Sequence, residues 1–516
     1  MRQTGAGQIK KLKSRDENAI FNWLSVTGCA LAACALAAAL FFFLIGLLVS
    51  DSSGYAGVTF LPPLALALLG FALIGAGIVR ERWRRKRGRP SSFFRKRVVD
   101  PSRLIRGTGL IAIISGLVIG TFALLVAGAG LLATVEYTES NAFCGEVCHQ
   151  VMNPEATVYA DSAHAQIACV DCHVGQGGDS YIRAKLNGLR RVYAIVAGEF
   201  DRPIPTPIHN RLPANKMCEG CHTRDRLIGQ KAITRSYALS GEDTEFVKLR
   251  MMVNVGGGAD GFMKGSGIHF HMLIAQKVEY VARDPQRQDI AWVRVTRFDG
   301  EIKEYSNEED PLTEAERESL EVRTMECLDC HSRPAHRFRS PVDSVNSAIA
   351  AGAISAQIPY VKEAAVRALD GDYETTEEAM TAIADRFLSF YEEEYPEVIE
   401  GDPHKLDDSI GVLQKIYRRT IFPEMKADWR AHPNNIGHRD SPGCFRCHND
   451  EMVSEAGEAV FTDCTKCHAI LAEGEEVVEA SNFDEGLAFV HPEDWETIEE
   501  FTVCWDCHTG GADAYE

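Results

Sequence analysis

The chain has 516 residues and a formal net charge of −19, with 73 acidic against 54 basic side chains. This balance excludes a nucleic-acid-binding protein, because phosphate backbones are bound by a surplus of Lys and Arg. The sequence also lacks a Gly-rich nucleotide loop, a nucleophile elbow and a transporter-like repeat, whereas its 16 cysteines are unusually many.

Three apolar stretches lie near the N-terminus, at residues 19–49, 58–79 and 107–135. A helix needs about 20 apolar residues to cross the hydrocarbon core of a bilayer, so we predict three transmembrane helices. The first stretch is too long for the apolar region of a cleaved signal peptide, and a second span follows it closely. Both features favour a retained helix over a signal sequence.

Basic residues predict the orientation of these helices. The tail 1–18 carries five Lys and Arg, and the loop 80–106 carries twelve against only Glu81 and Asp100. Cytoplasmic segments are enriched in Lys and Arg, so both segments should face the cytoplasm. The rest of the chain then lies in the periplasm, anchored to a bacterial inner membrane.

The exported part is acidic. From Thr134 onward, 37 Lys and Arg stand against 68 Asp and Glu, a net charge of −31. Such a surface could attract a basic soluble partner at low salt, or it could simply keep the protein soluble. Both interpretations stay open at the level of sequence.

Seven short motifs use fourteen of the sixteen cysteines. Six are Cys-x-x-Cys-His and one is Cys-x-x-x-Cys-His, the pattern in which two thiols bond to porphyrin vinyl groups and the His binds iron. They predict seven covalently bound haem c groups, and hence a protein that transfers electrons. In chain order the motifs are Cys144–Cys148–His149, Cys169–Cys172–His173, Cys218–Cys221–His222, Cys327–Cys330–His331, Cys444–Cys447–His448, Cys464–Cys467–His468 and Cys504–Cys507–His508.

Zinc is the competing interpretation of so many cysteine pairs. A structural zinc site needs four protein ligands and has no fixed His directly after each pair, so seven repeats with that His favour haem. The first motif, Cys144-Gly-Glu-Val-Cys148, is one residue longer than the others, which stretches the usual attachment geometry. Cys29 and Cys34 lie in an apolar stretch, where a thiol acts as a small hydrophobic side chain.

The exported region divides by composition into five parts. Residues 136–230 hold haems 1–3, residues 231–320 form a β-rich insert and an acidic linker, and residues 321–341 hold haem 4. Residues 342–425 are predicted to form a helical scaffold, because apolar residues recur there at three-and-four spacing. Residues 426–516 form a C-terminal cluster with haems 5–7.

Strand character is strongest in the insert. Trp292–Phe298 alternates with period two, and Asp299-Gly300 is a hairpin turn signal before Ile302–Tyr305. We therefore predict a small antiparallel sheet around Phe246–Tyr305. The fold class is thus a membrane-anchored multihaem c-type cytochrome, with three N-terminal transmembrane helices and then a mainly α or irregular haem-packed periplasmic region with a small antiparallel β insert.

An electron-transfer haem needs a second axial ligand, usually His or Met. More than enough histidines lie outside the motifs to serve seven irons. These nine are His164, His209, His269, His271, His336, His404, His432, His438 and His491.

These histidines differ in how strongly they are favoured as ligands. Four lie close in sequence to a haem motif and are preferred: His164, His209, His336 and His438. His269 and His271 are two apart in a predicted strand and so share a face, and one of the two is expected to bind iron. For three histidines both roles stay open, iron ligand or hydrogen-bonded loop residue: His404, His432 and His491. Met152 would raise the potential of the first haem if its thioether bound the iron, although an isolated Met more often serves packing.

Three successive segments resemble a known family. They are Phe143-Cys-Gly-Glu-Val-Cys-His-Gln-Val-Met152, Ser162-Ala-His164 and Cys169-Val-Asp-Cys-His-Val174, shortly after an apolar stretch. Their order, within residues 134–225, resembles the NapC/NirT/NrfH family of membrane-anchored quinol dehydrogenases. The whole layout is similar to that of the heptahaem inner-membrane cytochromes of metal-reducing bacteria.

The resemblance implies oxidation of menaquinol beside the first haem, at the outer leaflet of the membrane. Family members contact the quinol through a Lys and an acidic residue shortly after the second haem motif. Lys185 in this sequence matches the Lys, and Arg191 stands about where the family has Asp. Lys185 could alternatively be a snorkelling residue at the membrane interface.

These observations predict an inner-membrane enzyme of anaerobic or extracellular respiration, a menaquinol:cytochrome c oxidoreductase. It would pass electrons from the menaquinone pool along seven haems, through the C-terminal cluster, to a small periplasmic c-type cytochrome. Two alternatives stay open: a relay subunit without its own quinol site, and a terminal multihaem reductase with an open haem. The direction of electron flow and a homo-oligomeric state are open as well.

Overall fold

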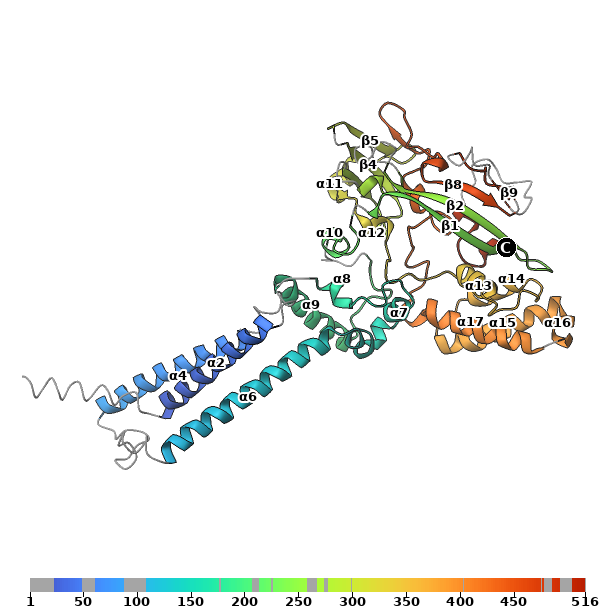
Figure 1. Cartoon of the computed structure of the whole chain (residues 1–516). Helices are drawn as coiled ribbons and strands as arrows, with labels where there is room; N and C mark the ends of the chain where they lie inside the picture. Colours follow the sequence, from blue (N-terminus) through green and yellow to red (C-terminus); the bar gives the residue numbers. More distant parts are fainter. Residues whose placement is uncertain are drawn as a thin grey trace, which may run out of the picture. The chain divides into compact units, whose positions relative to one another are not determined.

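The computed structural model contains the helices and strands that Figure 1 labels. The chain divides into two compact units, Met1–Ser140 with Val174–Leu189 and Asn141–His173 with Arg190–Glu516. The basic tail 1–18, most of the basic loop 80–106 and His209 lie outside the described residues. The structure describes residues 23–48, 61–87, 108–175, 178–206, 213–223, 226–257, 267–272, 277–297, 299–401, 403–474, 476–477, 485–491 and 504–515.

The first unit is built from three long helices, α2 (Trp23–Leu48), α4 (Leu61–Lys86) and α6 (Thr108–Glu139). α2 packs against both of the others (Figure 1). Two glycines meet where α2 and α4 cross, and a Cβ added to Gly28 would lie 2.5 Å from the Gly70 carbonyl oxygen. Such small residues let apolar helices approach closely and gain van der Waals contact.

One of these helices contains a segment that qualifies by length and composition as a membrane span. Within the residues that the structure describes, that segment is Gly120–Glu139 of α6. In α2, the residues whose side chains the structure describes give a shorter apolar segment, Leu24–Ala37, and α4 ends in a charged run that contains four arginines and a lysine. Of the three predicted transmembrane helices, the described residues thus support one.

The second unit begins with short elements around the first three haem motifs: η1 (Phe143–Val147), α7 (His149–Ala160), α8 (Cys169–His173) and α10 (Ala214–Met217). The longer helix α9 (Gly178–Ala197) follows the second motif in the chain. η1 is a π-helical turn, in which each hydrogen bond spans one residue more than in an α-helix. That turn accommodates the extra residue between Cys144 and Cys148.

Two antiparallel sheets follow in the second unit (Figure 1). The first has the strand order β1 (Gly229–Ala238), β2 (Phe246–Gly256), β8 (His468–Glu473) and β9 (Glu476–Val477). The second has the order β6 (Arg323–Thr324), β3 (Lys277–Ala282), β4 (Ile290–Thr296), β5 (Ile302–Asn307) and β7 (Met452–Ser454).

The predicted hairpin is present between β4 and β5, with Trp292 opposite Ser306. Gly300 in its turn has a φ of 87°, a left-handed conformation that favours glycine, and its N–H donates to the Arg297 carbonyl at 3.0 Å. The predicted small antiparallel sheet is therefore confirmed, but β2 belongs to the other sheet. Each sheet also takes strands from the C-terminal haem region, β8 and β9 in the first sheet and β7 in the second, so the insert and that region fold together.

Helices occupy most of the region that the sequence predicts as helical. They are α13 (Pro341–Ala350), α14 (Val361–Leu369), α15 (Thr376–Glu394), α16 (Pro396–Gly401) and α17 (Pro403–Thr420). The Ser340 hydroxyl caps α13 by accepting a hydrogen bond from the Asp343 N–H at 3.2 Å. Apolar side chains from these helices form a shared core, whose fully buried members include Leu369, Phe387 and Leu413.

Candidate haem centres

Six pairs of histidine rings lie at nearly the same separation within the second unit. In each pair one ring belongs to a haem motif and the other to a histidine outside the motifs. The ring centres are 5.8 to 6.3 Å apart. The pairs are His164 with His222, His173 with His336, His269 with His331, His271 with His448, His438 with His468 and His491 with His508.

This separation fits an iron atom bound between the two rings. A metal–imidazole bond is about 2 Å long and the ring centre lies about 1 Å beyond the bonding nitrogen, so two axial imidazoles need about 6 Å between their centres. Among the described residues, no group of three or more His, Cys, Asp or Glu side chains converges on a common metal position. A haem iron needs only two protein ligands, because the porphyrin supplies the other four. The residues present therefore fit haem.

Hydrogen bonds at the second ring nitrogen orient five of these histidines. When Nδ1 donates to a carbonyl oxygen, Nε2 keeps the lone pair that a metal binds. The Nδ1-to-oxygen distances are 2.9 to 3.3 Å. The partners are the backbone carbonyls of Pro334 for His164, Val255 for His269, Ile268 for His271, Glu155 for His336 and Phe461 for His448.

Burial favours the neutral form of the rings, the form in which imidazole binds a metal. Desolvation lowers the pKa of His271 to about 4. Desolvation also holds the pKa of six motif or partner rings below the usual range of histidine: His173, His331, His438, His448, His468 and His508.

Consecutive motifs are neighbours along the whole series. The thiol of Cys144 lies close enough to Cys169 to raise its pKa, and the thiol of Cys327 does the same for Cys218. Electrostatic interactions link the remaining neighbours, namely Cys172 with Cys221, Cys330 with Cys444, Cys444 with Cys467 and Cys464 with Cys504. The seven motifs therefore form one unbroken series in chain order, an arrangement that positions cofactors for stepwise transfer.

Three of the predicted ligand residues are not brought to a motif histidine by these contacts. His404 on α17 is exposed, with 90% of its side chain accessible, and its Nδ1 lies 3.9 Å from an Asp407 carboxylate oxygen. His432 is buried against Phe338, with ring centres 5.1 Å apart. Met152 is half-buried on α7.

The predicted strand for His269 and His271 is wrong. His269 lies in a turn and His271 in the short 3-10 helix η3 (Phe270–Met272), and the two rings face different motif histidines. Gly267, with a φ of 77°, reverses the backbone just before them, so the period-two argument fails. The geometry favours both residues as iron ligands, not one of the two.

Sequence reasoning did not find the residues beside the first motif. The Asn141 amide donates to the Tyr159 hydroxyl at 2.9 Å, and its carbonyl oxygen accepts from the Cys169 N–H at 2.8 Å. Both residues line a pocket of about 350 Å³ with Gly145 and Glu146. Asn and Tyr occur in no recognisable spacing here, so the sequence carries no signal for this arrangement.

The two residues predicted to act on a quinol both lie on α9. The Lys185 ammonium donates to the Thr138 hydroxyl at 2.9 Å and lies 3.8 Å from a Glu139 carboxylate oxygen. Thr138 and Glu139 belong to the last turn of α6, where its apolar segment ends. Arg191 is exposed. Burial and then His336 lower the pKa of His173, and the charge of Arg191 adds to that effect.

Comparison with known proteins agrees with these centres. Residues 107–236 match the NapC/NirT cytochrome c family, N-terminal region. The chain is 36% identical over 501 residues to the cytochrome c-type protein ImcH of Geobacter sulfurreducens, an alignment that covers 96% of each chain. It is 30% identical over 112 residues to the cytochrome c nitrite reductase subunit NrfH of Nitratidesulfovibrio vulgaris, covering 22% of this chain and 67% of that one. No solved structure matches the chain.

The family prediction made from the motifs is thereby confirmed. Similarity to ImcH extends over nearly the whole length, and the NapC/NirT match covers the region of the first three motifs. Taken with the haem motifs, these similarities identify a membrane-anchored electron-transport protein. The chain belongs to the NapC/NirT family of multihaem c-type cytochromes.

Proposed function

We propose that the chain oxidises menaquinol at a bacterial inner membrane and passes the electrons through seven haem c groups to a periplasmic carrier. The observation that carries the proposal is the unbroken series of neighbouring motifs, with six pairs of histidines at the spacing of an iron. Haem, when bound, supplies one-electron transfer. The backbone carbonyls that hold Nδ1 of five histidines fix their orientation, which preorganises the iron sites of motifs 2 to 5.

The membrane part of the proposal depends on α6. Its segment Gly120–Glu139 is apolar enough to anchor the chain. The loop 80–106, with twelve basic residues, precedes it and would face the cytoplasm by the positive-inside rule. The haem motifs all follow α6 in the sequence, so they would lie on the periplasmic side.

Menaquinol is the electron donor that the family resemblance implies. Its oxidation releases two electrons and two protons, so a site needs a group that binds a quinol oxygen and a group that accepts a proton. Lys185 can donate to the oxygen, and the Glu139 carboxylate 3.8 Å from its ammonium can take up a proton. Arg191 stands where the family has an acid, and a guanidinium does not accept protons. We therefore assign proton uptake to Glu139.

Electrons would leave from the C-terminal motif, the last in the series. The region from Thr134 onward carries a net charge of −31. Such a field draws in a positively charged partner and accelerates its association at low salt. A small basic periplasmic cytochrome is the partner that fits this surface.

The same geometry argues against a terminal reductase. A site that reduces a small substrate needs an iron with an open coordination position, whereas six motif histidines already face a second histidine. A relay subunit fed by another membrane enzyme would share this geometry. Only a direct reaction with quinol distinguishes a quinol dehydrogenase from a relay subunit.

Anaerobic stopped-flow mixing of the oxidised full-length protein with a reduced menaquinone analogue provides that separation. We expect fast reduction of the haems, slowed roughly tenfold or more in Lys185→Ala by loss of one charge-assisted hydrogen bond. Lys185→Arg should retain part of the rate, and Lys231→Ala, at an exposed position on β1, should react like the unaltered protein. Reduction by dithionite but not by the quinol would identify a relay subunit.

A further inference from the structure

Every haem motif carries one charged residue between its two cysteines, and the sign of that charge changes along the chain. Motifs 1 to 4 carry an acid and motifs 5 and 6 carry a base, whereas motif 7 carries an acid again. In chain order the residues are Glu146, Asp171, Glu219, Asp329, Arg446, Lys466 and Asp506. The change from acid to base falls between motifs 4 and 5.

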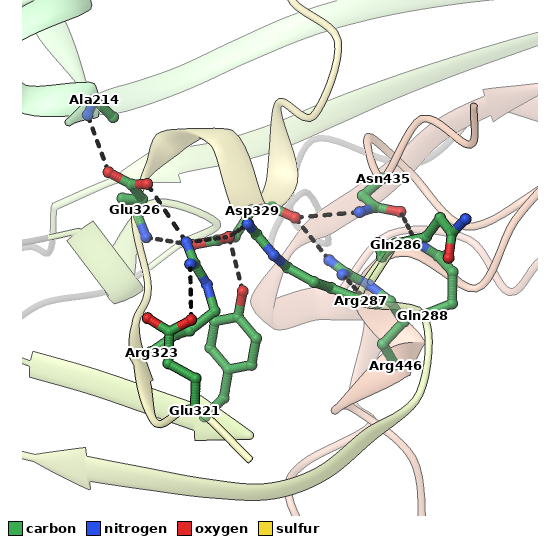
Figure 2. Close-up of polar contacts among 11 residues, drawn as sticks. Ala214, Gln286, Arg287, Gln288, Glu321, Arg323, Glu326, Asp329, Asn435 and Arg446 are labelled. Carbon is green, nitrogen blue, oxygen red and sulfur yellow. Dashed lines mark hydrogen bonds and ion pairs between the residues drawn. The ribbon is translucent and has the colours of Figure 1, made fainter. Parts of the chain in front are cut away.

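A buried polar cluster joins those two motifs, and Figure 2 shows it. Asp329 of motif 4 is 3% exposed, and its carboxylate accepts from the Tyr280 hydroxyl at 2.8 Å and the Glu326 N–H at 2.7 Å. The guanidinium of Arg287, itself 7% exposed, pairs with the same carboxylate. The negative charge of Asp329 is therefore neutralised by a direct partner.

Arg446 of motif 5 is bound differently (Figure 2). Its guanidinium donates to three backbone carbonyls, those of Gly443 at 2.8 Å, Arg287 at 2.6 Å and Asp329 at 2.9 Å. Carbonyl oxygens hold the side chain in place but carry no net charge. In the contacts that the structure describes, the guanidinium meets no carboxylate within salt-bridge distance. A fixed positive charge therefore stands at the junction of motifs 4 and 5.

Arg446 lies between the two haem-attachment cysteines of motif 5, Cys444 and Cys447. It reaches motif 4 through the Asp329 carbonyl, at 2.9 Å. A haem bonded to Cys444 and Cys447 therefore lies within the field of Arg446.

A positive charge favours the reduced form of a nearby iron, because the ferrous state carries one positive charge fewer than the ferric state. Water screens the charged residues of several other motifs more strongly. Lys466 is 62% exposed and faces Asp463 at 3.7 Å, and Asp171 and Glu146 are exposed. Arg446 is only partly exposed, so its charge is screened less than theirs.

We infer that Arg446 sets an upward step in reduction potential at the junction of motifs 4 and 5, so that electrons settle in the C-terminal part of the series. In this role Arg446 is a positioning and tuning residue, not a catalytic one. The inference deepens the proposed function by giving the flow a direction, and it rests on that function only for the presence of haems and not for the quinol site.

A spectroelectrochemical titration of the full-length protein tests the inference without any quinol. In Arg446→Gln, one or two of the seven potentials should fall, so that the oxidised-to-reduced ratio of those haems at a fixed electrode potential rises roughly tenfold, about 59 mV for a one-electron couple. Arg446→Lys, which keeps the charge, should stay close to the unaltered protein. Arg297→Gln, an exposed arginine paired with Glu301, is the matched control and should shift none.

A second variant provides the test if Arg446→Gln does not fold. Asn435→Asp adds a negative charge to the same cluster while Arg446 keeps its three carbonyl contacts, and Asn435 is 4% exposed (Figure 2). It should lower the same potentials. The inference is overturned if neither variant shifts a potential, or if Arg446→Lys shifts it as much as Arg446→Gln. If the potentials shift as expected but quinol does not reduce the haems, the result would contradict the quinol site and still support the role of Arg446.

Discussion

The ring of His336 lies 6.1 Å from the ring of His173, centre to centre, although six strands and two further haem motifs separate them in the chain. His336 Nδ1 contacts the Glu155 backbone oxygen at 3.0 Å and a Glu155 carboxylate oxygen at 3.2 Å. Arg333 approaches that carboxylate to 3.1 Å. The ligand pair of the second motif is thus assembled by α7, α8 and the segment after α12 (Cys327–Cys330).

Replacing His336 by Ala should leave the iron of the second motif with one protein ligand. One of the seven haems should then convert from low spin to high spin, because a five-coordinate ferric iron has a weaker ligand field. Electron paramagnetic resonance of the oxidised protein measures this change. His404→Ala, at an exposed position, should leave the spectrum unaltered. A low-spin spectrum in His336→Ala would refute the pairing.

Replacing Glu155 by Gln should destabilise the region around α7 by about 3 kcal/mol, because it leaves the buried Arg333 guanidinium without its counter-charge. The two side chains are 11% and 8% exposed. Hydrogen exchange of the α7 amides reports the free energy of local opening. Glu301→Gln breaks the exposed pair with Arg297 and should cost less than about 1 kcal/mol in its own hairpin. If both variants lose the same free energy of local opening, burial does not determine the strength of these ion pairs.

Replacing Gly28 by Leu should separate α2 from α4. The added Cβ alone meets the Gly70 carbonyl oxygen at 2.5 Å, and overpacking of this kind costs about 1 to 3 kcal/mol. A lower melting temperature of the detergent-solubilised protein is the expected result. Gly75→Leu is the matched control on α4, since a Cβ there meets nothing within 4 Å. Equal melting temperatures of the two variants would contradict the close crossing of α2 and α4 at Gly28.

His432 should make the fold acid-sensitive. Burial, and then the charge of Arg333, lowers its folded-state pKa to about 4, whereas in the unfolded chain the value is near 6.5. Between these values the unfolded state binds more protons, so the free energy of unfolding falls by up to about 3 kcal/mol as the pH drops from about 6.5 to about 4.

The measurement for His432 is urea unfolding across that pH range. His432→Gln should flatten the pH dependence, because glutamine does not titrate. His404→Gln removes an exposed histidine and should keep the slope of the unaltered protein. A slope that survives in His432→Gln would assign the acid sensitivity to other groups.

Much of this architecture could be predicted from local patterns. Cys-x-x-Cys-His fixes an attachment site by covalent chemistry, and Asp299-Gly300 fixes a turn by backbone sterics, so both are readable within a few residues. The pairing of β2 with β8 cannot be predicted from a local pattern, because it joins residues such as Val253 and His468 that lie far apart in the chain.

The sequence predictions that differ from the structure also concern features that a local pattern does not determine. His269 and His271 follow a positive-φ glycine in a turn, and a pattern of alternate residues cannot detect that reversal. Hydropathy also predicts three spans, whereas among the described residues Gly120–Glu139 of α6 is the segment that qualifies by length and composition. The π-turn that holds the longer first motif also has no sequence signature of its own.

Low-temperature electron paramagnetic resonance of the fully oxidised full-length protein, with spin quantification against its iron content, tests the central claim most directly. We expect seven irons per chain, of which at least six are low-spin with two histidine ligands. Fewer than seven irons, or a high-spin signal from two or more of them, would contradict the paired-histidine series on which electron transfer depends.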